Sequence, residues 1–364
     1  MNLIDRYIIK QFVNTLVFSI LALYIIFLVV SMLENLDKFL DAGVSVTIII
    51  QYYLYYFPEI LKLLTPVAML LATLFSVGRL ANLNEITAMR TGGLSLYRLM
   101  LPLLILSNLL SFGQLYFNGW IVPKAIEKKL FIEQKYLKKV SESGGPIYNL
   151  YMRDSPNSNL NMQYYNADTK LGNKIGIEYF TDNINPRMNK RISAETLTWD
   201  SLSMKWKLID GFVRNYDYKN RQKVMIEKFD TLEVELNLKH DQIKQMKKTI
   251  AEMNYSEVYN YLQTLKQGGR EVTKEMTSYY GDFAYPFANF IVVLFVVPFA
   301  SIRKKGGVAV QIAAALVIAF SYLIFTKVSQ TIGTSIHLSP ELSGWGANII
   351  FFVGGLINLL RSKA

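Results

Sequence analysis

The chain has 364 residues, no cysteine, two histidines and a formal net charge of +11, and 51% of its residues are hydrophobic. Without cysteine it can form neither disulfides nor thiolate metal sites, and a zinc or iron site would need an improbable all-carboxylate shell. The sequence contains no Gly-x4-Gly-Lys-Ser/Thr phosphate loop and no Gly-x-Ser-x-Gly nucleophile elbow, which excludes the usual ATP-binding loop and serine-hydrolase motif.

Six stretches are apolar over about 20 residues, the length that crosses a ~30 Å hydrocarbon core as a helix. Five carry no acid or base, and the second carries only Glu59 and Lys62 near its start, where a long side chain can reach the headgroups. The first is too long for a signal peptide and no small-x-small cleavage site follows it. The predicted spans are residues 12–33, 58–78, 99–122, 283–302, 308–326 and 342–360.

Lysine and arginine are distributed unequally between the loops on the two sides of these spans. With the N-terminus in the cytoplasm, the inside segments hold ten of them, and the short outside loops hold three, Lys38, Lys62 and Lys327. Positive charge concentrates on the cytoplasmic side of membrane proteins. The distribution therefore predicts that both termini are cytoplasmic and that residues 124–278 lie outside.

Residues 124–278 have a different texture from the spans. A charged continuation of the third helix is followed by six segments of alternating polarity, separated by Asp, Asn, Gly and Pro groups, which is typical of an antiparallel, jelly-roll-like all-β domain. Apolar residues at helical spacing over 254–266 predict a helix that ends at Gly268 and Gly269, and a second helix leads into the fourth span. We therefore expect an α-helical membrane protein with six spans, divided into residues 1–123, a periplasmic β domain at 124–278, and residues 279–364.

A short polar stretch, LANLNEITAMRTGG at residues 80–93, separates the second and third spans. A helix over about 80–92 would place its leucines and isoleucine on one side and Glu85 and Ala88 nearly opposite, with Met89 beside them. Glu85 is the only acid of this basic loop. The helix is either a solvated connector or a surface for a cytoplasmic partner. Six spans without a nucleotide site favour the second interpretation, a permease driven by a separate ATPase.

Several segments resemble the LptF/LptG family of lipopolysaccharide-export permeases. They are LIDRYIIKQF, LDKFLDAGVS, GRLANLNEITAMRTGGLSLYRL, VPKA, and YPFANFIVVLFVVPFA followed by RKKGG. The β insert is similar in length, position and texture. WGAN at residues 345–348 departs from the family, whose members usually carry a proline before the asparagine. Chain length and the N-terminal pattern are more similar to LptG than to LptF.

The resemblance implies a non-enzymatic transport subunit in the inner membrane of a Gram-negative bacterium. Its implied partners are a paralogous LptF-like permease, an LptB-like cytoplasmic ATPase dimer that binds the ATP and Mg, and a periplasmic LptC/LptA-like bridge that receives lipopolysaccharide. This chain itself needs no cofactor, no metal and no nucleic acid. The implied coupling residues are Glu85, Ala88, Met89 and Arg90, with Glu85 meeting an arginine of the ATPase.

Candidate substrate residues follow from charge and polarity. Lysines that emerge with the first three spans could hold lipid phosphates: Lys38, Lys62, Lys124, Lys128 and Lys129. Lys62 could instead snorkel or pair with Glu59, and the last three could be solvated helix faces. Apolar residues of the first and fifth spans could form the seam toward the paralogue and the acyl chains, although any lipid-facing surface would look the same: Phe18, Phe27, Val310, Ala314 and Ile318.

The predicted strands carry aromatic residues, among them Tyr164, Tyr179, Phe180, Trp199, Trp206 and Phe212. These could line an interior for acyl chains, and ordinary core packing is the simpler interpretation. An open sheet edge could join the bridge by strand addition.

Other function classes remain open. A membrane-bound lipid-modifying enzyme would have to use Asp282 with His337. An exporter of another envelope lipid would share the mechanics and differ in cargo, whereas a scaffold would not copurify with an ATPase.

Overall fold

The computed structural model describes residues 3–137, 146–181, 186–217, 223–301, 307–336 and 338–361. The chain divides into two compact units, Met1–Lys139 with Thr273–Ala364, and Val140–Val272. The helical unit is larger than the predicted boundaries at 124 and 278 allow. It takes in α5 (Val122–Leu137), which packs against α2 (Val46–Asn82), and α8 (Thr273–Ala284), which packs against α11 (Pro340–Arg361).

Five helical stretches among the described residues are long and apolar enough to cross a membrane. They are α1 (Leu3–Asp41); α2; α4 (Leu96–Tyr116) with its π-helical continuation η1 (Phe117–Ile121) and α5; α8 with η3 (Tyr285–Phe287) and α9 (Ala288–Ala300); and α11. They correspond to the first four and the sixth predicted spans. α10 (Gly307–Ser335) covers the predicted fifth span, and several of its side chains lie outside the described set. α11 runs without a break through WGAN.

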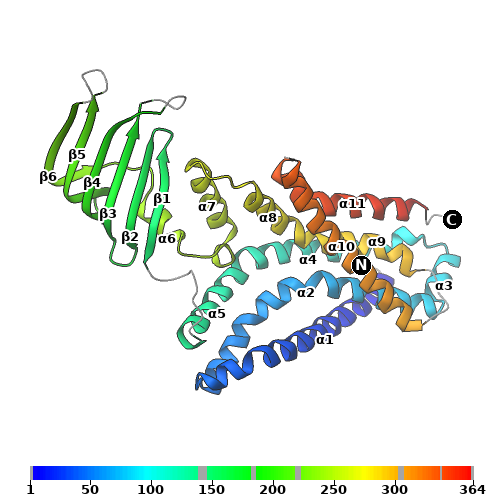
Figure 1. The fold of residues 1–364 in the computed structure, drawn as a ribbon. Helices are drawn as coiled ribbons and strands as arrows, with labels where there is room; N and C mark the ends of the chain where they lie inside the picture. Colours follow the sequence, from blue (N-terminus) through cyan, green and yellow to red (C-terminus); the bar gives the residue numbers. More distant parts are fainter. Residues whose placement is uncertain are drawn as a thin grey trace. The chain divides into compact units, whose positions relative to one another are not determined.

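The core of the helical unit is organised around α9. A helix that is apolar on all sides is suited to a protein core or to lipid, and α9 is buried against α2, α4 and α11. α1 and α2 form a long antiparallel hairpin (Figure 1). Tyr24 of α1 meets Phe57 of α2 edge to face, with ring centroids 4.9 Å apart, and these contacts fix how the two helices are aligned.

All six predicted strand segments are confirmed as strands of one antiparallel sheet. The described strands follow one another in chain order as a meander (Figure 1), so the expected jelly-roll-like texture arises from consecutive hairpins. The strands are β1 (Ile147–Ser155), β2 (Ser158–Asn166), β3 (Leu171–Phe180), β4 (Met188–Asp200), β5 (Lys205–Asp217) and β6 (Lys223–Val234).

A crease crosses this sheet, defined here by one residue from each strand: Asn149, Gln163, Lys174, Glu195, Asp210 and Asp230. The strand register is the same on the two sides of the crease, as the pairs Met162↔Ile175 and Tyr164↔Asn173 show. The crease residues themselves have no assigned pairing. Its members on alternate strands have left-handed backbones, with φ of 52°, 52° and 51° at Asn149, Lys174 and Asp210. The buried positions change phase there, as at Met162 and Tyr165 of β2. The crease therefore bends the whole sheet around its core.

At one end of the sheet, an aromatic cluster packs beside α6 (His240–Gln245) and covers part of the sheet's hydrophobic core. Trp206 is 1% exposed and donates its indole N–H to the Leu238 carbonyl at 2.8 Å, so ordinary core packing is confirmed for this residue. The Tyr165 hydroxyl lies 2.7 Å from His240 Nδ1. Burial raises the pKa of Tyr165 and lowers the pKa of His240. Phe212, by contrast, is 41% exposed and does not belong to the interior.

Candidate functional site

The polar stretch between the second and third spans forms a shorter helix than predicted. α2 continues to Asn82, and α3 comprises only Glu85–Thr91. The expected helix over residues 80–92 is interrupted at Asn84, whose φ of 59° is left-handed; asparagine adopts this conformation more readily than most residues. Leu80 is thus buried in the last turn of α2, and Glu85 is the first residue of α3.

The two sides of α3 differ from the predicted ones at Met89. Ile86 is buried and Met89 is partly buried, and both pack on the core of the helical unit. Ala88 and Arg90 are exposed and Glu85 is half-buried. The structure therefore groups Met89 with the inner face, because Ile86 and Met89 lie three residues apart on one side of the helix. The outward face retains Glu85, Ala88 and Arg90.

The N-terminus of α1 braces this segment at two points. The Tyr7 hydroxyl donates to Glu85 Oε2 at 2.9 Å. Asp5, 8% exposed, accepts two 2.9 Å bonds from the Arg98 guanidinium at the start of α4. Sequence reasoning missed both residues, although DRY lies within the first segment that carries the family resemblance. The first bond ties Glu85 to α1, and the second ties α1 to the start of α4.

The structure brings three of the five predicted lysines into contact with neighbouring helices. Lys62 lies 3.5 Å from Asp282 of α8, and Lys129 pairs with Glu59 of α2. The alternative pair of Lys62 with Glu59 is therefore not formed, because Lys129 takes that carboxylate. Lys128 lies over the Tyr55 ring at 5.2 Å, and Lys124 is exposed.

Lys38 lies apart from this group. Because Tyr24 packs on Phe57, Lys62 is level with α1 residues near position 19, and at ~1.5 Å per residue Lys38 is about 28 Å further along the helix. Its ammonium donates to Asn35 at 3.3 Å. The five lysines therefore do not form a single cluster in this structure.

The predicted apolar seam residues fall into two sets. Phe18, Phe27 and Val310 are 72%, 40% and 45% exposed. Ala314 and Ile318 line a groove of about 490 Å³ formed by α9, α10 and α11, together with Phe295 and Phe299. α1 and α10 both pack on α2.

The enzymatic alternative has little structural support. Asp282 is engaged with Lys62, and His337 lies outside the described residues. Within the described ranges, no group of three or more His, Cys, Asp or Glu residues is placed to hold a metal ion.

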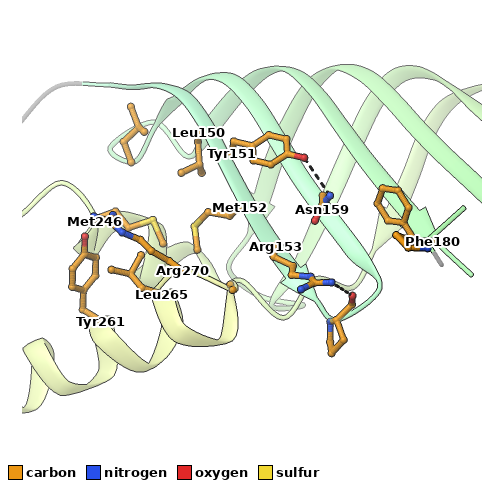
Figure 2. A pocket seen from close by; sticks show the side chains of 15 residues that line it. Leu150, Tyr151, Met152, Arg153, Asn159, Phe180, Met246, Tyr261, Leu265 and Arg270 are labelled. Carbon is orange, nitrogen blue, oxygen red and sulfur yellow. Dashed lines mark hydrogen bonds between the residues drawn. The ribbon is translucent and has the colours of Figure 1, made fainter. Parts of the chain in front are cut away.

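The β unit contains a hollow of about 600 Å³ beside its first strand. Figure 2 shows Leu150 and Met152 of β1 near Leu265 and Tyr261 of α7 (Tyr255–Gln267). Arg153 donates to the Pro156 carbonyl at 2.6 Å, and Asn159 donates to the Tyr151 hydroxyl at 3.2 Å. The hollow thus combines apolar walls with a polar rim at an edge strand.

These helices, the inserted sheet and the braced α3 agree with a family match over nearly the whole chain. The family described as lipopolysaccharide export system permease LptF/LptG matches residues 6–361. The chain belongs to this family. Lipopolysaccharide export system permease protein LptG of Escherichia coli strain K12 is 20% identical over 373 residues, covering 100% of this chain and 99% of that protein. The LptG protein of E. coli O6:H1 has the same identity and coverage. LptF/LptG proteins are transport permeases, so the chain is a membrane transport subunit.

Proposed function

We propose that the chain is an LptG-like subunit of an exporter that extracts lipopolysaccharide from the inner membrane, driven by ATP hydrolysis on a separate LptB-like dimer. It spans the membrane six times with both termini cytoplasmic and the β unit periplasmic, an orientation supported by the ten inside against three outside lysines and arginines. The family match along residues 6–361 is the observation that carries the proposal.

In this proposal α3 transmits force from the ATPase. Tyr7 occupies one carboxylate oxygen of Glu85, and the other accepts an arginine of the ATPase; ATP and Mg remain on that partner. A charge-assisted pair of this kind fixes the register between two moving surfaces. Ala88 and Arg90 complete the outward face of α3, and Met89 anchors it from behind.

Substrate phosphates meet the lysines near Asp282. The Lys62–Asp282 and Lys129–Glu59 pairs are partly exposed, so an anionic headgroup can replace a carboxylate without leaving a buried charge unpaired. Lys124 and Lys128 extend this basic surface along α5, and Lys38 acts separately at the far end of α1. The acyl chains and the LptF-like paralogue face Phe18, Phe27, Val310, Ala314 and Ile318.

The periplasmic bridge joins a terminal strand of the sheet. In the described sheet β1 and β6 are each paired on one side only, and β1 lies beside the residues of α7 that line the hollow. We therefore assign strand addition to β6, which leaves main-chain hydrogen-bonding groups for a bridge strand.

Glu85→Ala tests the coupling role in the assembled complex. The variant is expected to insert into the membrane normally and to lose ATP-dependent transfer of lipopolysaccharide. Glu34→Ala, which removes an exposed acid of α1, is the matched control and should transfer normally. Normal export by the Glu85 variant would contradict the role of α3.

The cargo is tested by purifying the intact complex and identifying its bound lipid by mass spectrometry. Lipopolysaccharide supports the proposal, and a different envelope lipid would assign the same mechanics to another exporter.

A further inference from the structure

Three helical stretches of the membrane unit interrupt their α-helical geometry near one another. α2 contains Pro66, the π-helical turn η1 separates α4 from α5, and the 3-10 turn η3 separates α8 from α9. Prolines, π turns and 3-10 turns all disturb the regular main-chain hydrogen bonds of a helix. In an apolar environment the freed groups need other partners.

At the α2 interruption, the partners come from two other helical stretches. Pro66 has no N–H, so the carbonyl of Lys62, four residues earlier, loses its helical donor. Gln114 of α4 donates its side-chain N–H to this carbonyl at 3.1 Å. The Tyr285 hydroxyl of η3 donates to the next carbonyl, that of Leu63, at 2.8 Å. A side chain of α4 thus replaces one helical bond of α2, and η3 adds a bond to the neighbouring carbonyl.

Side chains of two other helices also bond at the interruption between α8 and α9. The carbonyl of Ala284, the last residue of α8, accepts from the Asn348 side chain of α11 at 2.6 Å. Asn348 in turn accepts from the Tyr322 hydroxyl of α10 at 2.7 Å. Both side chains are buried, 3% and 5% exposed.

Gln114 connects the interruptions. Its amide oxygen accepts from Asn289, which lies just beyond η3 and is 0% exposed, while its N–H holds the Lys62 carbonyl. One turn further along, within η1, Asn118 is 2% exposed, and neither atom of its amide has a partner among the described residues. A buried, unpartnered amide one turn from Gln114 offers a second set of bonds to the same network.

We infer that Pro66, η1 and η3 form one hinge layer, held by Gln114 and its partners, at which these three helical stretches bend together during transport. A sharp kink in a regular helix breaks main-chain bonds, whereas here a side chain of another helix supplies one of them and can exchange. Asn118 supplies the donor and acceptor that the second arrangement requires. The inference deepens the proposed function, because α2 leads directly into α3 and carries its displacement through Pro66.

A double-mutant cycle tests the bond that defines the layer. In the complete, detergent-solubilised complex, Gln114→Leu removes the partner of the Lys62 carbonyl and should lower the thermal midpoint. Pro66→Ala restores an N–H to α2, so the same Gln114 substitution should lower the midpoint less in the Pro66→Ala background. Ser111→Ala, which removes a bond within α4, should cost the same in both backgrounds. Equal losses from Gln114→Leu in the two backgrounds would overturn the inference.

Motion is tested by spin labels, which the absence of native cysteine makes straightforward. Leu54→Cys and Leu83→Cys, 66% and 58% exposed, lie on opposite sides of Pro66. In the complex with its ATPase in nanodiscs, the distance between these labels should change between the nucleotide-free and vanadate-trapped states. Pro66→Ala should reduce the change. A Val17→Cys and Leu40→Cys pair on α1, a single uninterrupted helix, should show none.

The two failures are distinguishable. An unchanged label distance in a complex that hydrolyses ATP and transfers lipid, or an undiminished change with Pro66→Ala, overturns the hinge and leaves the proposed function standing. A complex that contains no ATPase contradicts the proposed function, and the double-mutant cycle still decides whether the layer exists.

Discussion

The crease of the sheet and the hinge layer of the helices solve a similar problem with different bonds. Each places irregular backbone at corresponding positions of neighbouring elements. In the sheet, regular pairing resumes on both sides of the crease, as at Tyr148↔Tyr164 and Leu150↔Met162. In the helices, the side chains of Gln114, Tyr285 and Asn348 bond to main-chain carbonyls at the interruptions.

The difference shows which irregularity is fixed and which can move. The crease is built from backbone conformation and register, and changing it would move paired strands together. The hinge layer depends on individual side-chain bonds that can be exchanged one at a time. We therefore expect the sheet to respond mainly to added volume and the helices mainly to lost polar groups.

The largest expected effect is steric and falls at the crease. Gly211 follows Asp210, and a Cβ at this position would overlap the Ser193 carbonyl oxygen and lie 2.5 Å from the Phe229 ring. Gly211→Ala should destabilise the β unit by about 3 kcal/mol, measured by denaturation followed through tryptophan fluorescence. Gly113→Ala in α4, where a Cβ would meet nothing within 4 Å, is the control. If the two variants were equally stable, the claim that a Cβ at position 211 overlaps its neighbours would be contradicted.

A smaller effect is expected from a polar group of the helical unit. Asp5→Ala leaves the Arg98 guanidinium without its bidentate partner. The Asp5 side chain is 12% exposed and that of Arg98 37%, so solvent screens part of the loss, and the variant should be destabilised by less than Gly211→Ala. Glu235→Ala, which removes a 79%-exposed partner of Lys205, should destabilise the protein less than Asp5→Ala. Thermal denaturation of the complex measures both, and equal costs would argue against the importance of the brace.

The smallest effect is a pH dependence confined to the β unit. Burial lowers the pKa of His240 in the folded protein, so the folded state binds fewer protons than the unfolded state, where the pKa is about 6.5. The contribution of His240 to the free energy of unfolding is fully present above about pH 6.5 and declines as the pH falls below that value. The thermal midpoint of the β unit should drop between pH 7.5 and 5.5, and His240→Gln should reduce the drop. An identical drop in the variant would assign it to other groups.

The sequence predicted what depends on local pattern. Apolar length located the five helical stretches that are long enough to cross a membrane, and alternating polarity located all six strands, because both signals lie within a few neighbouring residues. The break of α3 was not predicted, because the helical pattern continues through Asn84 and its left-handed backbone is not visible in the polarity. The prediction that Met89 lies beside Glu85 and Ala88 on the outward face was wrong for the same reason.

Long-range pairings were beyond the sequence. Tyr7 and Glu85 are 78 residues apart, and Lys62 and Asp282 are 220 apart, so no periodicity connects them. The role of Pro66 could be anticipated as a missing N–H, but the residue that replaces the bond, Gln114, is determined by the packing of α4 on its neighbours.

The most direct test of the account is photo-crosslinking from position 85 in living cells. A photoreactive amino acid in place of Glu85 should crosslink to the cytoplasmic ATPase, whereas the same probe at Leu202, which is 97% exposed in the β unit, should not. Absence of an ATPase crosslink from position 85, in cells where the complex assembles, would contradict the claim that α3 receives the force for export.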